Sequence, residues 1–210
     1  ALEVVGTDSQ KETYLTKLVS GEWTGAMVLT EPGAGSDLGS LITTATPNGD
    51  GTYALNGQKI YITWGDHDAT DNIVHLVLAR LPDAPKGPKG ISLFLASKFA
   101  VKEDGTMGDR NAFRPVGVEH KLGIHASPTC VMSYEGATAE MVGQPNQGLA
   151  HMFVMMNAAR LAVGVEGVGI AERAYQHALQ YAQERKQGRS VWTGVANAPI
   201  LDHPDVRRTL

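Results

Sequence analysis

The feature that most constrains this fold is a long helical segment from Gln147 to near Gln187. Its side chains are apolar or small on nearly every face, which is typical of a helix surrounded by other helices. Gly164, Gly167 and Gly169 weaken an isolated helix, and close packing of a neighbouring helix would compensate for that cost. One small β domain could not bury such a segment. We therefore expect this chain to be part of a larger protein, or to form an oligomer that covers the helix.

The region from Trp23 to about Met141 has a different sequence pattern, in which short β-prone runs are separated by turn residues. The sequences Asn48-Gly49-Asp50-Gly51 and Asn56-Gly57 are typical of hairpin turns. This spacing predicts a central antiparallel β-sandwich or open barrel. With the helical segment that follows, the fold class is α+β.

The segment before the β region predicts one short helix. Ser9 and Glu12 have the spacing of a capping box, and Gly21 is a plausible stop.

Composition excludes several classes of partner and site. The formal net charge of −4 gives no electrostatic reason to expect nucleic acid or an anionic membrane surface. Cys130 is the single cysteine, so an internal disulfide and a cysteine-based zinc site are excluded. The histidines lack metal-ligand spacing, so no metal is expected. No run reaches the ~18 apolar residues of a membrane span.

A glycine loop, "LTEPGAGSDLG" at residues 29–39, is the first candidate site. It lacks the Gly-Lys-Ser/Thr ending of a P-loop, and its glycine spacing and following strand do not fit a Rossmann unit. What remains is a strand, a loop and another strand, with the N–H groups of Gly35 and Ser36 free to meet a phosphate. A plain hairpin turn is the alternative, because Gly, Ser and Asp are common turn residues.

Three further stretches carry candidate site residues. In "NGQKIYITWGD", strand alternation places Tyr61 and Thr63 on one face, where a planar cofactor or simply a half-buried sheet could use them. In "HKLGIHASPT" a polar turn is expected. In the long helix, Asn157 and Arg160 share a face, and a guanidinium on an apolar helix needs an anionic or carbonyl partner. The "ERKQGR" end of that helix is basic, as the helix dipole favours.

Together, "LTEPGAGSD", "YALNGQKIYITWG", "KLGIHASPT" and "NAARLAVGVEGVGIAERAYQHALQYAQERKQG" resemble the FAD-dependent acyl-CoA dehydrogenase family, in order and spacing, over nearly the whole chain. Within it, "EHKLGIHASPTC" and the long helix are most similar to the branch that contains 3-methylmercaptopropionyl-CoA dehydrogenase. The resemblance implies three parts: residues 1–20 end an N-terminal helical domain, 21–140 form a middle β domain, and 141–210 begin a C-terminal helical bundle, truncated here.

The resemblance also implies roles for individual residues. Those matching FAD contacts in the loop and strand are Leu29, Thr30, Gly35, Ser36, Tyr61, Ile62 and Thr63. Ser36 also matches a position near the acyl-CoA, and Thr63 one that hydrogen-bonds near flavin N5. Most relatives read Trp-Ile-Thr-Asn where this chain reads Tyr-Ile-Thr-Trp.

The long helix is expected to reach the substrate and a second subunit. By resemblance, Asn157 and Arg160 contact the CoA part of the substrate, although many relatives carry Asp at the first position. Arg185 and Gln187 match a motif that reaches the FAD of a neighbouring subunit, although "RKQGRS" lacks the Phe common in relatives.

The implied activity is that of an oxidoreductase of fatty acid metabolism: α,β-dehydrogenation of an acyl-CoA thioester, with a carboxylate taking the α-proton and flavin accepting hydride. The family base is a Glu of the bundle, expected beyond Leu210, so no catalytic residue is assigned here and the fragment itself is expected to be inactive. The expected partners are acyl-CoA, electron-transfer flavoprotein and further copies of the chain in a tetramer, in the cytoplasm. The alternatives are an acyl-CoA oxidase and a catalytically inert β-domain fragment.

Overall fold

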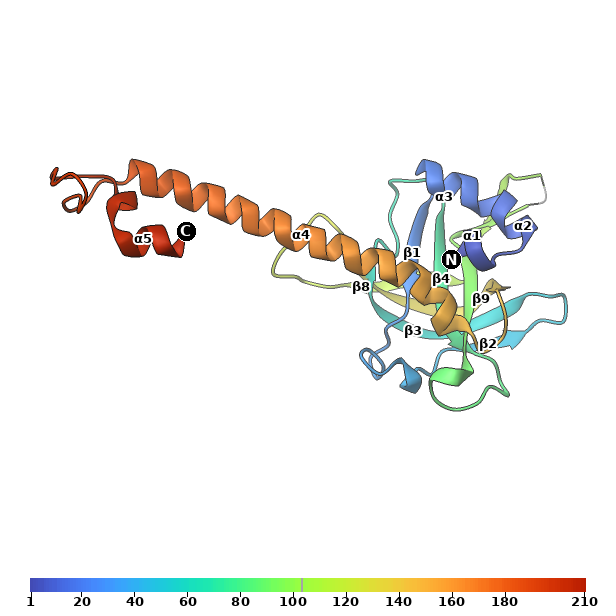
Figure 1. The fold of residues 1–210 in the computed structure, drawn as a ribbon. Helices are drawn as coiled ribbons and strands as arrows, with labels where there is room; N and C mark the ends of the chain where they lie inside the picture. The colour runs from blue at the N-terminus through green and yellow to red at the C-terminus, as the bar shows by residue number, and fades with distance from the viewer. Residues whose placement is uncertain (103) are drawn as a thin grey trace. The chain divides into compact units, whose positions relative to one another are not determined.

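A computed structural model describes residues 1–102 and 104–210. The chain divides into two compact units, Ala1–Met155 and Met156–Leu210, which are described separately. Figure 1 shows the strands of the first unit in blue to yellow and the second unit in orange to red. The mixed α+β fold predicted from the sequence is confirmed.

The first unit is built on a sheet that, among the described residues, contains seven strands. These strands are β1 (Thr24–Val28), β2 (Thr44–Pro47), β3 (Tyr53–Thr63), β4 (Ile73–Arg80), β5 (Ile91–Ser97), β8 (Phe113–Val118) and β9 (Thr129–Val142). The pairings run from β4 through β2, β3, β9 and β5 back to β4, so these strands close into a ring. The strands β6 (Phe99–Val101) and β7 (Met107–Arg110) form a separate ribbon.

The pairing of β4 departs from the antiparallel expectation. Both β1 and β2 run parallel to β4, whereas β4 and β5 are antiparallel. Parallel neighbours require a crossover connection. The long excursion through the glycine loop and the β2–β3 hairpin supplies that crossover, and therefore places the loop at one end of the β1–β4 pair.

The core fills the interior of the ring. Strands β4 and β5 are buried along nearly their whole length, which explains their continuous apolar runs in the sequence. Val77 and Phe94 belong to this core, as does Cys130, which is buried.

The turn predictions had different outcomes. Residues 48–52 do form the β2–β3 hairpin turn, with Asn48 N–H donating to the Thr52 carbonyl at 2.9 Å. The Asn56-Gly57 hairpin is wrong: both residues lie inside β3, where a register shift follows Leu55. Gly57 has φ +152°, and a Cβ there would lie 3.0 Å from Thr43 Cα, so the glycine permits close approach of two backbones.

The N-terminal helices are short, and the last three follow one another without a break. They are α1 (Leu2–Val5), α2 (Asp8–Gln10), the π-helical η1 (Lys11–Leu15) and α3 (Thr16–Ser20). The capping box lies at Thr7 and Gln10, so the Ser9–Glu12 prediction is wrong: Thr7 is the extended residue before the first turn, and Ser9 is already inside it. Gly21 ends α3 in the left-handed conformation, with φ 79°, as expected.

Helix α4 (Gly148–Glu184) matches the predicted long helix and continues from the first unit into the second. After it come η4 (Ile200–Asp202) and α5 (Pro204–Thr209). Large exposed apolar side chains of α4 are Val154, Leu161, Val163, Val165, Val168 and Ile170. Two short 3-10 turns, η2 (Leu38–Ser40) and η3 (Pro88–Gly90), lie in the first unit.

By length and composition alone, α4 is apolar enough to cross a membrane. This differs from the expectation drawn from uninterrupted apolar runs, because a mean over the helix tolerates isolated charged residues. One such helix is weak evidence for a span, since the core helix of a helical bundle has the same composition.

Candidate functional site

The glycine loop leaves β1 and ends in η2. Its first residues form a tight turn in which Glu31 and Ala34 exchange backbone hydrogen bonds of 2.9 and 3.0 Å. Gly35 and Ser36 follow and are exposed. Within the described residues, neither N–H makes a hydrogen bond, so both donors are available to a ligand or to water. The Asp37 carboxylate then ends the exposed stretch by accepting from Gly39 N–H at 2.9 Å.

The structure brings this loop against β3. The Ile60 N–H donates to the Thr30 carbonyl at 2.9 Å, which joins the two segments directly. This bond is available because β3 has a bulge between Lys59 and Ile62, where its pairing with β9 is interrupted. A bulge leaves a residue unpaired in the ladder and turns its backbone elsewhere. The loop and strand singled out in the sequence are therefore neighbours.

The bulge changes how the strand presents its side chains. Tyr61 has φ 60°, an uncommon left-handed conformation for a non-glycine residue, and is 60% exposed. Regular alternation, the reason given for placing Tyr61 and Thr63 on one face, is thus broken at Tyr61, yet both residues are exposed. Ile62 is 2% exposed and belongs to the core, so only its backbone can reach a ligand.

A buried ion pair, which the sequence reasoning missed, lies behind the loop. The Lys59 ammonium contacts the Glu31 carboxylate at 2.9 Å and donates to the Leu29 carbonyl at 2.8 Å. The Glu31 carboxylate accepts from the N–H groups of Ile42 at 2.7 Å and Thr43 at 3.0 Å. The signal that could have found the pair is a lysine at an inward strand position beside apolar neighbours.

Burial and pairing shift the pKa values of both partners. Burial lowers the pKa of the Lys59 ammonium to about 8, against the opposing effect of Glu31. Burial alone would raise the pKa of the Glu31 carboxyl, but the Lys59 charge and the hydrogen bonds from Ile42 and Thr43 outweigh it, so that pKa is lowered.

The turn after β3 is held by a buried histidine. The Nε2 of His75 lies 2.8 Å from the Gly65 carbonyl, which can only accept, so Nε2 carries the proton. Nδ1 therefore accepts from the Tyr134 hydroxyl. The imidazole also stacks on Phe113, with ring centroids 4.5 Å apart. Burial lowers the pKa of His75 to about 4, so the ring is neutral and fixed in one tautomer.

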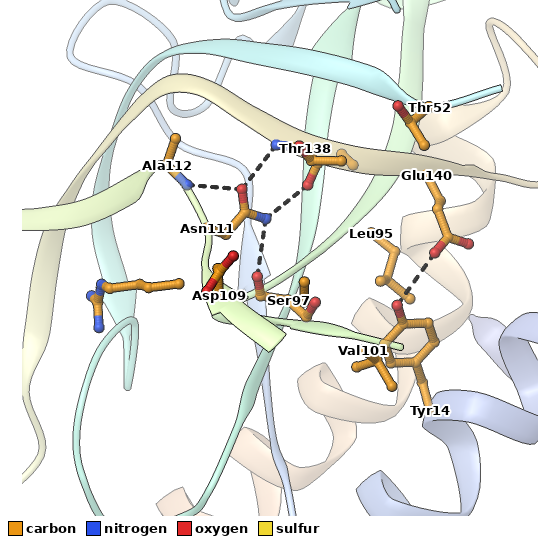
Figure 2. Close-up of a pocket in the computed structure, with 13 residues that line it drawn as sticks. Tyr14, Thr52, Leu95, Ser97, Val101, Asp109, Asn111, Ala112, Thr138 and Glu140 are labelled. Atoms are coloured by element: carbon orange, nitrogen blue, oxygen red, sulfur yellow. Dashed lines mark hydrogen bonds between the residues drawn. The ribbon is translucent and has the colours of Figure 1, made fainter. Parts of the chain in front are cut away.

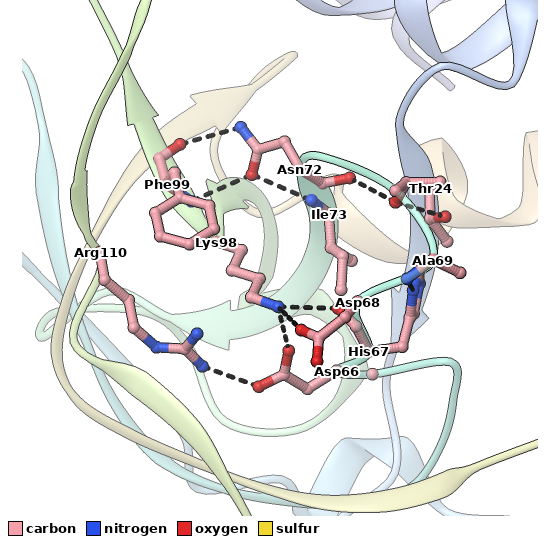
Figure 3. Close-up of polar contacts among 12 residues, drawn as sticks. Thr24, Asp66, His67, Asp68, Ala69, Asn72, Ile73, Lys98, Phe99 and Arg110 are labelled. Carbon is pink, nitrogen blue, oxygen red and sulfur yellow. Dashed lines mark hydrogen bonds and ion pairs between the residues drawn. The ribbon is translucent and has the colours of Figure 1, made fainter.

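A cluster of charges fixes the next few residues of the same turn. Figure 3 shows the Lys98 ammonium between Asp66 and Asp68, at 2.7 and 3.5 Å, with Arg110 reaching the other Asp66 oxygen at 2.7 Å. Burial opposes ionisation, but hydrogen bonds from Lys98 and Arg110 lower the pKa of the Asp66 carboxyl. The turn that follows Trp64 is therefore held from both sides.

The described part of the first unit also has a cavity of about 450 Å³, shown in Figure 2. At one side Tyr14 donates to Glu140 at 3.3 Å. At the other, the Asn111 amide bonds to the Ser97 and Thr138 carbonyls at 3.0 and 2.8 Å. None of the sequence-predicted site residues lines this cavity.

The remaining predicted residues lie in the second unit. Asn157 and Arg160 are exposed on α4. Arg185 and Gln187 follow its end, are exposed, and bond to each other through the guanidinium and the amide oxygen at 3.2 Å. The Gln187 N–H donates to the Ala198 carbonyl at 2.9 Å, which folds the chain back on itself. The structure thus groups the loop and strand residues in one unit and these four in the other.

Comparison with known proteins covers both units. Residues 26–137 match the family model described as acyl-CoA dehydrogenase, middle domain, and residues 146–210 match acyl-CoA dehydrogenase, C-terminal domain. A curated relative, 3-methylmercaptopropionyl-CoA dehydrogenase of Ruegeria pomeroyi, is 57% identical over all of this chain, which spans 36% of that protein.

Solved structures that resemble this chain belong to the same family. Butyryl-CoA dehydrogenase from Megasphaera elsdenii has 34% identity and a TM-score of 0.79, over 99% of this chain and 49% of that one. An acyl-CoA dehydrogenase from Bacillus anthracis, complexed with FAD, has 31% identity and a TM-score of 0.78, over 98% of this chain and 31% of that one.

Proposed function

Because this chain belongs to the acyl-CoA dehydrogenase family, we propose that the full-length protein that carries it catalyses FAD-dependent α,β-dehydrogenation of an acyl-CoA thioester. The chain spans about a third of the curated relative it matches at 57% identity, so the activity is proposed for the whole protein. Family membership confirms the resemblance drawn from the four sequence motifs.

One observation supports a dinucleotide site more than any other. The unbonded N–H groups of Gly35 and Ser36 lie on an exposed loop that is hydrogen-bonded to the bulged end of β3. Two adjacent free backbone donors suit a phosphate. A Cβ on Gly35 would make only an ordinary 3.6 Å contact with Thr30, so the glycine is not required by this chain's own packing and instead leaves room for a ligand.

The residues of the first unit would hold the cofactor as follows. Gly35 and Ser36 donate to phosphate oxygens, and Leu29 and Thr30 form the start of the same wall. Tyr61 and Thr63 offer an aromatic face and a hydroxyl donor next to it, with the Ile62 backbone between them. FAD, when bound, supplies the two-electron acceptor for this chemistry.

The proton acceptor is not assigned within this chain. Glu31 is 3% exposed and fully engaged by Lys59, Ile42 and Thr43, so it cannot reach a substrate. Glu166 and Glu184 do not match the family position of the base. We place the base in the bundle outside residues 1–210.

The second unit is proposed to contribute recognition. Asn157 and Arg160 would bind the CoA part of the substrate, and Arg185 and Gln187 would reach the FAD of a neighbouring subunit. The exposed apolar side chains of α4 support packing in a helical bundle and a tetramer. Electron-transfer flavoprotein is the proposed acceptor, and the cytoplasm the proposed location.

The test of the reaction uses the purified full-length protein. It should be yellow, contain FAD in near-stoichiometric amount, and lose flavin absorbance when an acyl-CoA is added without oxygen. Reoxidation by electron-transfer flavoprotein but not by oxygen identifies a dehydrogenase, whereas rapid reoxidation by oxygen identifies an oxidase. A colourless protein that takes up no FAD would contradict the proposal.

The test of the site compares two glycines of the first unit. Gly35→Ala should leave the thermal midpoint of the apoprotein unchanged but weaken FAD binding about tenfold, or ~1.4 kcal/mol, because the added methyl group occupies ligand space. Gly25→Ala, in β1, is the matched control, since its Cβ would also meet only one side chain, Leu18, at 3.5 Å. Equal FAD affinity for both variants would argue against the loop as the phosphate site.

A further inference from the structure

We propose that Glu31 and Lys59 are a positioning pair that holds the two ends of the glycine loop and the Tyr61–Thr63 strand in one arrangement, so that the Gly35 and Ser36 donors meet the cofactor in a fixed geometry. The inference rests on the proposed function of the loop. It assigns no chemical step to either residue, because neither reaches the surface.

The pair contacts the start of the loop and the residues that follow its end. On the entry side, the Lys59 ammonium donates to the Leu29 carbonyl at 2.8 Å. On the exit side, the Glu31 carboxylate accepts from Ile42 and Thr43 N–H at 2.7 and 3.0 Å. The ion pair itself, at 2.9 Å, joins these two sets of contacts. The chain between Leu29 and Thr43 is thereby closed at its base.

The pair also couples the loop to the strand. Lys59 is the last β3 residue paired with β9 before the bulge, and Ile60, next to it, donates to the Thr30 carbonyl at 2.9 Å. Tyr61 and Thr63 follow within a few residues. A shift of the Lys59 side chain would therefore move both the loop and the start of the exposed strand segment.

Energetics favour a positioning role over a stabilising one. Lys59 and Glu31 are 0% and 3% exposed, so the desolvation of both charges offsets much of the stabilisation that their attraction provides. An apolar pair of similar volume would fill the same space. It could not, however, bond to the Leu29 carbonyl or the Ile42 and Thr43 amides. What the charges add is a defined direction for each contact.

The experiment measures FAD affinity and thermal stability of the full-length apoprotein. Glu31→Gln or Lys59→Met alone leaves one buried charge unpaired, so both should lower the thermal midpoint and weaken FAD binding. The double variant Glu31→Gln/Lys59→Met removes both charges. Its midpoint should recover part of the loss seen in each single variant, because no unpaired charge remains, whereas its FAD dissociation constant should stay at least tenfold above that of the original protein.

A milder variant keeps both charges, so the inference can be tested even if the charge variants do not fold. Thr43 is fully buried and its hydroxyl donates to Glu31. Thr43→Val removes that donor with little change in shape, and FAD binding should weaken about threefold. Hydrogen exchange in the apoprotein should show faster exchange of the Ile42 and Thr43 amides in this variant.

The control is Asn111→Ala, which removes bonds to the Ser97 and Thr138 carbonyls of the same unit without touching the loop. It should lower the midpoint and leave the FAD dissociation constant unchanged. If it weakens FAD binding as much as the double variant does, affinity merely follows stability and the inference fails.

The remaining outcomes separate the inference from the function on which it rests. If the original protein binds FAD, and the double and Thr43→Val variants bind it equally well, the pair is purely structural and only the inference is overturned. If the original protein binds no FAD, the proposed function fails first, and the pair has no cofactor to position.

Discussion

The candidate site residues of the two units differ in how they are supported. Those in residues 1–155 are fixed by hydrogen bonds and a buried ion pair, whereas those in residues 156–210 are exposed on or beside a helix. In the first, the glycine loop is tied to β3 through Thr30 and Ile60, and a buried ion pair holds it from behind. In the second, Asn157, Arg185 and Gln187 are exposed, on or just after a helix whose large apolar side chains are also exposed.

The difference shows which candidate residues are positioned by contacts within their own unit and which are not. The first unit closes a ring of strands around its own core, so the positions of Gly35 and Ser36 follow from contacts within these residues. In the second unit the candidate residues are exposed, and the Arg185–Gln187 bond joins two of them to each other. The geometry of the proposed cofactor site is thus set within the first unit, whereas the proposed contacts to CoA and to a neighbouring subunit depend on what packs against α4.

The largest expected effect compares two leucines. Leu55 is fully buried in β3 and Leu161 is 73% exposed on α4. In residues 1–210, Leu55→Ala should reduce the free energy of unfolding by about 2–5 kcal/mol, since it leaves a cavity. Leu161→Ala should change it by less than about 0.5 kcal/mol. Urea denaturation of both variants measures this.

The same two leucines test whether other helices cover α4 in the full-length protein. In the full-length protein, Leu161→Ala should become as costly as a core substitution if other helices cover α4. An unchanged, small cost there would mean that this face of α4 is exposed in the complete protein too.

The next largest effect is a loss of stability at acid pH, caused by His75 of the first unit. Burial lowers the pKa of His75 from 6.5 to about 4 in the folded protein. Between these pH values the unfolded chain binds a proton at His75 that the folded chain does not, so this residue should lower the free energy of unfolding by about 3 kcal/mol as pH drops through the window. Below the window the His75 contribution is constant, and further loss comes from carboxylates such as Glu31 and Asp66, whose pKa values are lowered in the folded protein. Denaturation curves at several pH values measure the slope.

The control for this titration is His75→Gln, which cannot bind a proton in the window. It should be less stable at neutral pH, because the bonds to Gly65 and Tyr134 change, but it should lose most of the slope between pH 6.5 and about 4; the remainder comes from His67, whose pKa burial also lowers. An unaltered slope would assign the acid sensitivity to other groups.

The smallest effect compares two side chains that bond to nearby backbone. Thr7 accepts from Gln10 N–H at 3.2 Å in the first unit, and buried Ser190 accepts from Trp192 and Thr193 N–H, both at 3.2 Å, in the second. Replacing either with Ala should cost about 0.5–2 kcal/mol locally.

The two replacements should differ in how far the loss spreads. Thr7→Ala should lower the stability of the whole first unit, whereas Ser190→Ala should only speed hydrogen exchange of the amides from 192 to 195. Global destabilisation by Ser190→Ala would mean that the second unit unfolds together with the first, and would remove the contrast between them.

Sequence reasoning succeeded where the physical cause is local. The turn at residues 48–52, the helix ending at Gly21 and the long helix α4 each depend on neighbours a few positions away, so their patterns predict them. It failed where a distant segment decides. Asn56-Gly57 is a hairpin signal by itself, but the approach of Thr43 makes Gly57 part of a continuous strand.

For the candidate site, the sequence by itself indicated which residues suit a cofactor: a glycine loop with the N–H groups of Gly35 and Ser36, a Tyr and a Thr two positions apart, and an apolar helix that needs neighbours. Only the tertiary structure decided that the loop and strand touch, that Tyr61 projects from a bulge rather than from regular alternation, and that Lys59 faces Glu31. The reason is that burial of a charge, and the pairing of strands far apart in the chain, are set by the closure of the whole sheet, which no local pattern records.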